Sequence, residues 1–570
     1  MPSPNITESS IPESGNGRSR RWLLLVFICL LAWQIVLVWI FPHFATQDGP
    51  SHLYNAALIR SFHDPAWHRV PEFYQINSRL VPNWFTYAVL AGLYYVFSPA
   101  TAEKILVTGY FLLFPLSFAY VLRTLTRQLD LFAIWGLVLA NNAFIAMGFY
   151  NFCYGLVFFL LCFGYWMRWR DGFGPKQLAV LCVLASLLYF SHLVGFFMAA
   201  FFIGVVALSF NLVEWHCFGE NGGTRSGDTI STPLKRVLLP QLAFLPCLAL
   251  FFVSAIGLQP ETNPVIRTFS QRLAVLHELY VLVDTRSFLG IVRVCLVATF
   301  LLWGFSLVIA NAAKQRKLIA CDSLGILAAT CISLYSVLPW SISGGGMIPE
   351  RMAWFGLCGA LLWLGSKEWS IKARQVVIGA STLVVVLGLV GQTVWRYQLS
   401  PMLSAYDDAG RLLIPQKTIL SLCYCNPEGN PTPALVNVRT RPLEHAGDIA
   451  ALEGRALSIE NYEATGSSFP VEYSPRVNPA LHSKTLATFS SEPQIADAAD
   501  YETQTGKTID YVLLWGAGPG DSAESGSILD QQLRSNYEVI YTSSPPALLR
   551  LFKRRQTPAM PDPQLSHGQQ

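Results

Sequence analysis

Long apolar segments recur along this 570-residue chain, and their length constrains the fold more than any other feature. The first runs without interruption from Trp22 to Phe41, close to the roughly 20 residues that an α-helix needs to cross a bilayer. Only 13% of the residues are charged, whereas ordinary soluble domains contain about 25%. Most of the chain is therefore expected to lie in membrane lipid.

Ten further apolar runs are each close to the ~17–25 residue span of a transmembrane helix or a little shorter. Together with the first run, they predict an α-helical polytopic membrane protein with about eleven transmembrane helices. The predicted spans are 22–41, 105–122, 130–148, 152–167, 177–191, 193–213, 237–258, 290–311, 318–339, 352–366 and 375–395.

Clusters of Lys and Arg between the runs predict the orientation, because short basic loops stay on the cytoplasmic side. A tail over residues 1–20, which contains Arg18 and Arg20 and is followed by Arg21, is then cytoplasmic. The segment Trp84–Phe97 is short for a crossing, and we expect a helix at the outer surface there. If this segment crossed instead, the basic residues near Arg123 would lie outside, against the positive-inside rule.

Residues beyond the last span are more polar and predict a separate domain on the outer side. The transmembrane domain would cover 21–396, with a first outer loop at 42–104, and an extracytoplasmic α/β domain would cover 397–553. Strand-like runs at Tyr511–Trp515 and Glu538–Tyr541 support this domain. Residues 554–570 are rich in Pro and Gln and are expected to be disordered.

Polar residues gather at the outer ends of the predicted spans, where ionisable groups usually indicate function. Pro50 suits the first turn of a helix, Asp48 could cap that helix, and His52 would follow about one turn later. Other polar residues on the same side are the site-lining candidates Tyr150, Asn151, His192 and Glu350, together with Arg351. A carboxylate beside His, Asn and Arg is suited to general-base chemistry on a lipid-linked phosphate.

This arrangement resembles the GT-C class of integral-membrane glycosyltransferases, and most of all its bacterial branch that uses polyprenyl-phosphate sugar donors. The resemblance rests on one span, a long first outer loop with an acidic motif, a juxtamembrane helix, and a span preceded by Glu103-Lys104. It implies that Asp48 is the catalytic base with His52 beside it, and that Lys104 and Arg351 bind the phosphate of a lipid-linked donor.

The first loop also departs from that class. Many of its members carry adjacent carboxylates there, whereas this chain has Gln47-Asp48 and offers His52 as the second polar group. No cofactor is indicated by the residues themselves, and the resemblance leaves the use of a divalent metal ion open.

Two other functions compete with sugar transfer: a multi-span transporter, and a membrane-anchored scaffold whose outer domain binds a partner. Transporters place ionisable groups near the middle of the membrane, where the predicted spans here have almost none. A net charge of +4, with its basic residues in short loops, argues against nucleic acid as a partner. Outer regions without Asn-x-Ser/Thr favour a bacterial inner membrane, with the C-terminal domain in the periplasm.

Overall fold

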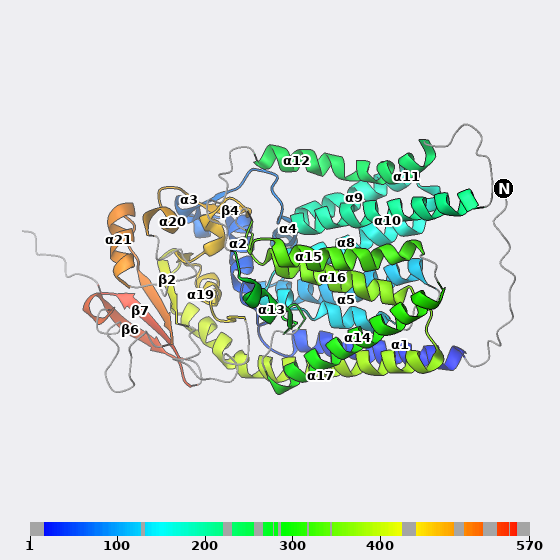
Figure 1. Ribbon diagram of the computed structural model, residues 1–570. Helices are drawn as coiled ribbons and strands as arrows, with labels where there is room; N and C mark the ends of the chain where they lie inside the picture. Colours follow the sequence, from blue (N-terminus) through cyan, green and yellow to red (C-terminus); the bar gives the residue numbers. More distant parts are fainter. Residues whose placement is uncertain are drawn as a thin grey trace, which may run out of the picture.

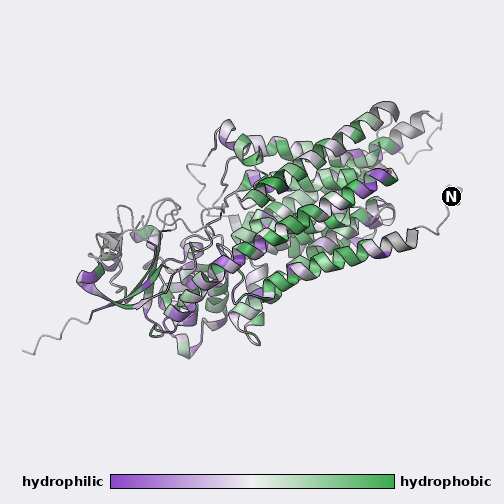
Figure 2. Cartoon of the chain, turned by 90° about the horizontal axis from the view of Figure 1, so that it is seen from below, coloured by the Kyte–Doolittle hydropathy of each residue, from purple (hydrophilic) through white to green (hydrophobic). Residues whose placement is uncertain are grey.

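The computed structural model contains a long helical bundle joined end to end with a smaller sheet domain (Figure 1). It describes residues 16–126, 132–220, 231–255, 266–277, 279–282, 287–315, 319–342, 345–424, 440–483, 495–516, 533–545 and 548–555. Hydrophobic residues dominate the bundle, and hydrophilic residues are concentrated in the sheet domain (Figure 2). This division of side chains is that of a membrane-embedded part and a water-facing part.

Within the described residues, eight helical segments are long and apolar enough to cross a membrane. One of them is made of two helices joined by a 3₁₀ turn, α11 (Ser231–Gln241) and α12 (Leu245–Ala255). The other seven are α1 (Asn16–Trp39), α5 (Pro99–Leu125), α8 (Tyr150–Trp169), α10 (Leu193–Glu220), α14 (Phe288–Gln315), α15 (Ser323–Val337) and α17 (Ile371–Gly410).

Three of the eleven predicted spans fall outside these eight, and each has a local reason. The run at 130–148 is divided into α6 (Ala133–Ala140) and α7 (Ala143–Met147), because the Asn142 side chain accepts a hydrogen bond from Ile145 N and starts a new helix. The run at 177–191 forms the 17-residue α9 (Pro175–Ser191). The run at 352–366 lies in α16 (Ile348–Gly365), which begins with a charged turn and is almost wholly buried.

The loop at 42–104 contains α2 (Gly49–Ser61), α3 (Val70–Phe73), β1 (Tyr74–Ile76) and α4 (Phe85–Leu93). At nine residues α4 is about 13 Å long, too short to cross a bilayer. Another short helix, α13 (Phe269–His277), lies between α12 and α14 in the sequence.

Among the described residues, the strands form two sheets. The larger has the order β3-β2-β5-β7-β6, with parallel pairing among β3, β2 and β5 and antiparallel pairing among β5, β7 and β6. The predicted strands at Tyr511–Trp515 and Glu538–Tyr541 are confirmed as β5 and within β6. The remaining elements here are β2 (Thr418–Cys423), α19 (Gly447–Glu453), β3 (Leu457–Ser458), β4 (Val471–Tyr473), α20 (Pro479–His482), α21 (Ile495–Thr505), β6 (Tyr537–Thr542) and β7 (Leu549–Arg554).

The loop at 42–104 packs into the C-terminal domain. β1 pairs antiparallel with β4, with Tyr74 opposite Tyr473. Tyr54 of α2 and Leu399 of α17 belong to the same buried hydrophobic cluster as the core of the sheet domain. Because α17 continues unbroken for 40 residues into this cluster, the bundle and the domain are joined by a continuous helix as well as by the loop.

Candidate active site between the first outer loop and the C-terminal domain

The start of α2 is fixed by backbone contacts from the loop between α7 and α8. Asp48 N donates to Met147 O over 2.9 Å, and Gly148 takes a left-handed conformation with φ of 84°. A side chain at Gly148 would place its Cβ only 2.6 Å from Gly49 N, so this close approach needs glycine. The Asp48 backbone is therefore held tightly at the end of the bundle.

Asp48 occupies the cap position of α2, as predicted, but its side chain does not cap the helix. It makes no capping hydrogen bond, and Thr46 Oγ1 instead accepts from Gly49 N over 3.2 Å. His52 lies one turn later, with its N–H donating to Asp48 O over 3.1 Å, which confirms the predicted spacing. The possibility that the Asp48 side chain only caps α2 is therefore not realised, and its carboxylate is available for another role.

The Asp48 carboxylate lies against the C-terminal domain. It is only 5% exposed, its Oδ1 is 3.9 Å from His445 Nε2, and the Tyr462 side chain hydrogen-bonds to it. Burial raises the pKa of Asp48 to about 6, although His445 and His52 both lower it. Asp48 Oδ1 is buried and has no hydrogen-bond partner, so this oxygen can accept a proton.

His52 is also buried, at 4% exposure, and one of its nitrogens is held firmly. Nδ1 lies 2.6 Å from the Tyr87 hydroxyl and 2.8 Å from Glu463 Oε1. Burial lowers the pKa of His52, but Glu463 offsets this and raises the pKa above its usual value. His52 Nε2 has no hydrogen-bond partner and is a second unsatisfied polar atom in the same cluster as Asp48 Oδ1.

Glu463 is the acceptor at the centre of this cluster. Its Oε2 receives hydrogen bonds from the Tyr87 hydroxyl and from Asn55 Nδ2, each over 2.6 Å. Burial would raise the pKa of Glu463, but His52 and these hydrogen bonds hold it below the usual value. A carboxylate of the C-terminal domain and an imidazole of α2 thus form a buried ion pair.

His445 supplies a second positive charge next to Asp48. Its Nδ1 is 2.9 Å from Glu460 Oε1, and although burial lowers its pKa, Glu460 raises it to about 10. The imidazole stacks on Tyr462, with ring centroids 4.3 Å apart. His445 is therefore a cation at neutral pH, and it favours the ionised form of Asp48.

The other predicted site residues make different contacts, and only Tyr150 lies against the cluster around Asp48. Tyr150 faces the Asp48 side, where its hydroxyl donates to Glu103 Oε1 over 2.6 Å and its ring lies 5.5 Å from that of His52. Asn151 supports the start of α4, because its Oδ1 accepts from Thr86 N over 3.0 Å. Tyr150 therefore joins the Asp48 group, and Asn151 positions the loop.

Arg351 and His192 are hydrogen-bonded to each other. The Arg351 guanidinium packs over Phe149 and Phe152, with centroids 5.2 and 4.7 Å away. Glu350 is buried and forms an ion pair with Arg267. The contacts described for Arg351 do not include Asp48, and its contact with a donor phosphate stays a prediction.

Lys104 does not contact the Asp48 group either. Its Nζ donates to Phe41 O over 2.6 Å and lies 5.9 Å from the Trp39 ring, at the end of α1. Such contacts are those of a lysine that ties two spans together near the membrane surface. Its binding to a donor phosphate also stays a prediction.

Sequence reasoning missed the half of the site that comes from the C-terminal domain, namely His445, Glu460, Tyr462 and Glu463. A local signal did exist, since three of the four stand within the short stretch Glu460-Asn461-Tyr462-Glu463. Among the described residues, no group of three or more His, Cys, Asp or Glu side chains could hold a metal ion.

Known protein families and curated protein sequences provide no match to this chain. The chemistry of the site therefore rests on its own geometry.

Proposed function

We propose that this protein is an integral-membrane glycosyltransferase that moves a hexosyl or pentosyl group from a polyprenyl-phosphate-linked donor to an acceptor at the outer membrane face. The observation that carries the proposal is Asp48, with a buried unpartnered oxygen and a pKa of about 6. A general base works best when its pKa lies near the operating pH.

The proposed reaction uses Asp48 as the base. The acceptor hydroxyl attacks the anomeric carbon of the donor, the bond from that carbon to the phosphate oxygen breaks, and the proton passes to Asp48 Oδ1. Polyprenyl phosphate leaves with the bonding electrons. The His52–Glu463 pair, 2.8 Å apart, keeps a positive charge one helical turn from the base. Since Asp48 is almost fully buried, the substrates reach it when the contact with His445 opens.

The proposed topology has about eleven crossings, with the short helices α6–α7, α9 and α16 completing the bundle. The N-terminus is cytoplasmic and the C-terminal domain lies in the periplasm of a bacterial inner membrane. The basic residues between spans support this orientation. Cys423 is disulfide-bonded, and disulfides persist in oxidising compartments such as the periplasm.

A scaffold would explain the docked domain but not its unsatisfied atoms. A buried polar atom without a hydrogen-bond partner costs about 1–3 kcal/mol of stability. An interface selected only for docking would give Asp48 Oδ1 and His52 Nε2 a hydrogen-bond partner each. A transporter would need its ionisable groups near the middle of the spans, whereas Asp48 and His52 lie at the junction with the sheet domain.

Reconstitution into liposomes tests the proposal against these alternatives. Purified protein is supplied with a panel of hexosyl- and pentosyl-phosphate polyprenols and a cell-envelope extract, and the release of polyprenyl phosphate is followed by chromatography. Consumption of one donor is the expected result. If no donor is consumed while the liposomes accumulate a solute, the result favours the transporter hypothesis over the glycosyltransferase hypothesis.

A further inference from the structure

Acidic side chains outnumber histidines where α2 meets the C-terminal domain. This contact surface holds the carboxylates Asp48, Asp448, Glu460 and Glu463 and the imidazoles His52 and His445. Even with both imidazoles protonated, these described side chains would leave an excess of negative charge in a largely buried place. We propose that the contact surface is a pH-sensitive latch, which closes with the uptake of protons and opens as the pH rises.

Both imidazoles already have a glutamate as their partner. His52 Nδ1 lies 2.8 Å from Glu463 Oε1, and His445 Nδ1 lies 2.9 Å from Glu460 Oε1. The two glutamates stand in one short segment after β3, so this segment neutralises both cations. The two aspartates of the contact surface remain outside these pairs.

Asp448 of α19 is fully buried, and the groups that hydrogen-bond to it are hydroxyls. Ser51 Oγ of α2 donates to Asp448 Oδ2 over 2.7 Å, and Ser458 Oγ of β3 donates to Asp448 Oδ1 over 2.8 Å. Neither hydroxyl carries a charge, and a buried carboxylate without a paired cation is costly unless it is protonated. One oxygen of Asp448 is thus bonded across the contact surface and the other within its own domain.

The elements around Asp448 do not supply a compensating cation among their described residues. α19 packs against α2, α17, β2 and β3, and neither of these strands contains a charged residue. The charged side chains near the C-terminal end of α17 are already paired, Asp407 with His43 and Arg411 with Asp408 and Glu453.

Charges near the start of α19 have opposing effects on Asp448. His445 lowers the pKa of Asp448, but the negative charge of Glu460 raises it more. Arg441 pairs with Glu444 over 3.3 Å and is exposed. The charges of this segment therefore do not favour ionisation of Asp448.

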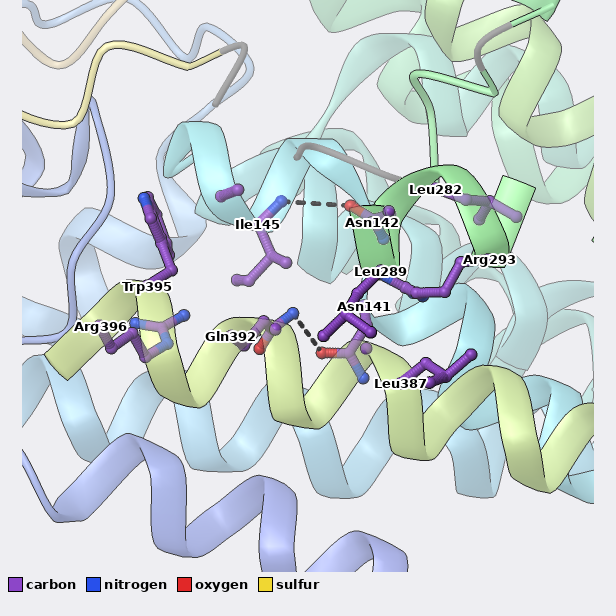
Figure 3. Close-up of a pocket in the computed structure, with 14 residues that line it drawn as sticks. Asn141, Asn142, Ile145, Leu282, Leu289, Arg293, Leu387, Gln392, Trp395 and Arg396 are labelled. Carbon is purple, nitrogen blue, oxygen red and sulfur yellow. Dashed lines mark hydrogen bonds between the residues drawn. The ribbon is translucent and has the colours of Figure 1, made fainter. Parts of the chain in front are cut away.

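The buried arginines of the bundle belong to a different place. Arg396 of α17 lines a pocket together with Arg293 and Gln392, and all residues of this pocket come from the bundle (Figure 3). Arg396 also packs over Phe44, and its charge acts on Glu103. These arginines lie on the bundle side of the contact surface.

The direction of the pH effect follows from which state holds its protons more tightly. Burial raises the pKa of Asp448 to about 7 and that of Asp48 to about 6, whereas an exposed aspartate has a pKa of about 3.9. The closed state therefore binds these two protons more tightly, and opening releases them. Opening becomes easier as the pH rises from about 4 to about 7, and above that range these two groups add nothing further.

Most of the other groups of the contact surface act in the same direction. Burial lowers the pKa of both imidazoles, but the glutamates raise it more, for His445 to about 10. Burial raises the pKa of Glu460. Burial also raises the pKa of Glu463, but His52 lowers it further, so Glu463 favours closing as the pH rises. This opposing effect ends near the usual glutamate pKa of about 4.3.

The latch would control access to Asp48, which is buried while the contact surface is closed. A rise in pH would then both ionise the proposed base and uncover it. This consequence rests on the proposed function. The pH dependence of closing does not, because it is measured without any substrate.

Amide hydrogen exchange of the full-length protein in nanodiscs tests the latch. Ser458 N donates to the Tyr54 hydroxyl across the contact surface over 3.0 Å, so residues 456–463 report its opening. Protection factors are measured from pH 5 to pH 8, with the intrinsic pH dependence of exchange divided out. We expect protection of this segment to fall about tenfold or more between pH 5 and pH 7. Protection of β5, which lies inside the larger sheet, should stay constant.

Asp448→Asn distinguishes the latch from a purely structural role of this side chain. Asparagine has the same shape and can still accept a hydrogen bond from Ser51, but it does not ionise. We expect the variant to be better protected than the wild type at pH 8 and to depend less on pH. Asp500→Asn, at an exposed position of α21, should behave as the wild type.

Two results would overturn the inference: equal protection of wild-type residues 456–463 at pH 5 and pH 8, or protection in Asp448→Asn that is lower than in the wild type at every pH. The second result is the one expected if Asp448 only contributes hydrogen bonds. Neither measurement involves sugar transfer, so a failure of the proposed function would leave both expectations unchanged.

Discussion

Asp48 Oδ1 lies 3.9 Å from His445 Nε2, so a residue from the loop at 42–104 and one from the C-terminal domain meet in a single buried site. Domain interfaces are common places for ligand sites because both sides contribute polar groups. In this chain the loop supplies the Asp48 carboxylate, and the C-terminal domain supplies His445, which lowers the pKa of Asp48.

The pH dependence of sugar transfer should follow the ionisation of the Asp48 carboxylate. A base must be ionised to act, so the rate is expected to be full above the Asp48 pKa of about 6 and to fall as the pH drops through it. His445→Gln removes a cation that lowers this pKa, and the midpoint should move to higher pH. Rate profiles between pH 5 and 8 measure the shift. His482→Gln, in the same domain, is the control, and an unchanged midpoint in His445→Gln would remove His445 from the site.

Tyr54 should hold the C-terminal domain onto α2. Its hydroxyl donates to Ala456 O over 2.9 Å and accepts from Ser458 N over 3.0 Å, and Tyr54→Phe leaves both groups unpaired. We expect the opening free energy of the interface to fall by about 1–3 kcal/mol. Amide hydrogen exchange of residues 456–463 measures this opening free energy. Tyr95→Phe, at a site 74% exposed, should change nothing, and identical exchange in the two variants would argue against this contact.

Gly148→Ala should disturb the site without touching any of its side chains. An L-residue in the left-handed region costs about 1–2 kcal/mol, and the added Cβ would press on Gly49 N. A displacement of Asp48 by about 1 Å is expected to slow transfer roughly a hundredfold. Turnover of Gly148→Ala is compared with that of Gly172→Ala, where a Cβ meets nothing within 4 Å. Equal turnover would show that the Gly148 contact is not needed.

The proposed orientation can be tested by thiol labelling of intact cells. Ser78 and Lys176 are both exposed; Ser78 lies in the loop at 42–104 and Lys176 in the first turn of α9. A membrane-impermeant maleimide should label Ser78→Cys but not Lys176→Cys, and both should react after permeabilisation. Labelling of Lys176→Cys in intact cells would invert the topology.

Sequence reasoning was strongest where the structure is local. Apolar runs predicted the long helices because each one satisfies its own backbone hydrogen bonds. The spacing of Asp48 and His52 followed from one helical turn. The helix break at Asn142 was missed, because an asparagine within an apolar run interrupts the helix only when its side chain caps a new one.

The C-terminal half of the site could not be predicted for a different reason. Glu463 meets His52 only after α17 has carried the chain back to the loop and β4 has paired with β1. Contacts of this kind depend on the packing of distant segments, and no local pattern encodes them. Arg351 illustrates the converse, because its place at the end of a predicted span suggested proximity to Asp48, while its described contacts are with His192, Phe149 and Phe152.

The most direct test of Asp48 as the base is its replacement by asparagine. Asp48→Asn keeps the shape of the side chain but removes the proton acceptor. The substitution leaves the helix cap intact, because Thr46 Oγ1, and not Asp48, accepts the hydrogen bond from Gly49 N. In reconstituted liposomes we expect normal protein level and insertion, with transfer reduced by about a hundredfold or more, within the range for general-base catalysis. Turnover by Asp48→Asn equal to that of the wild type would contradict the assignment of Asp48 as the base.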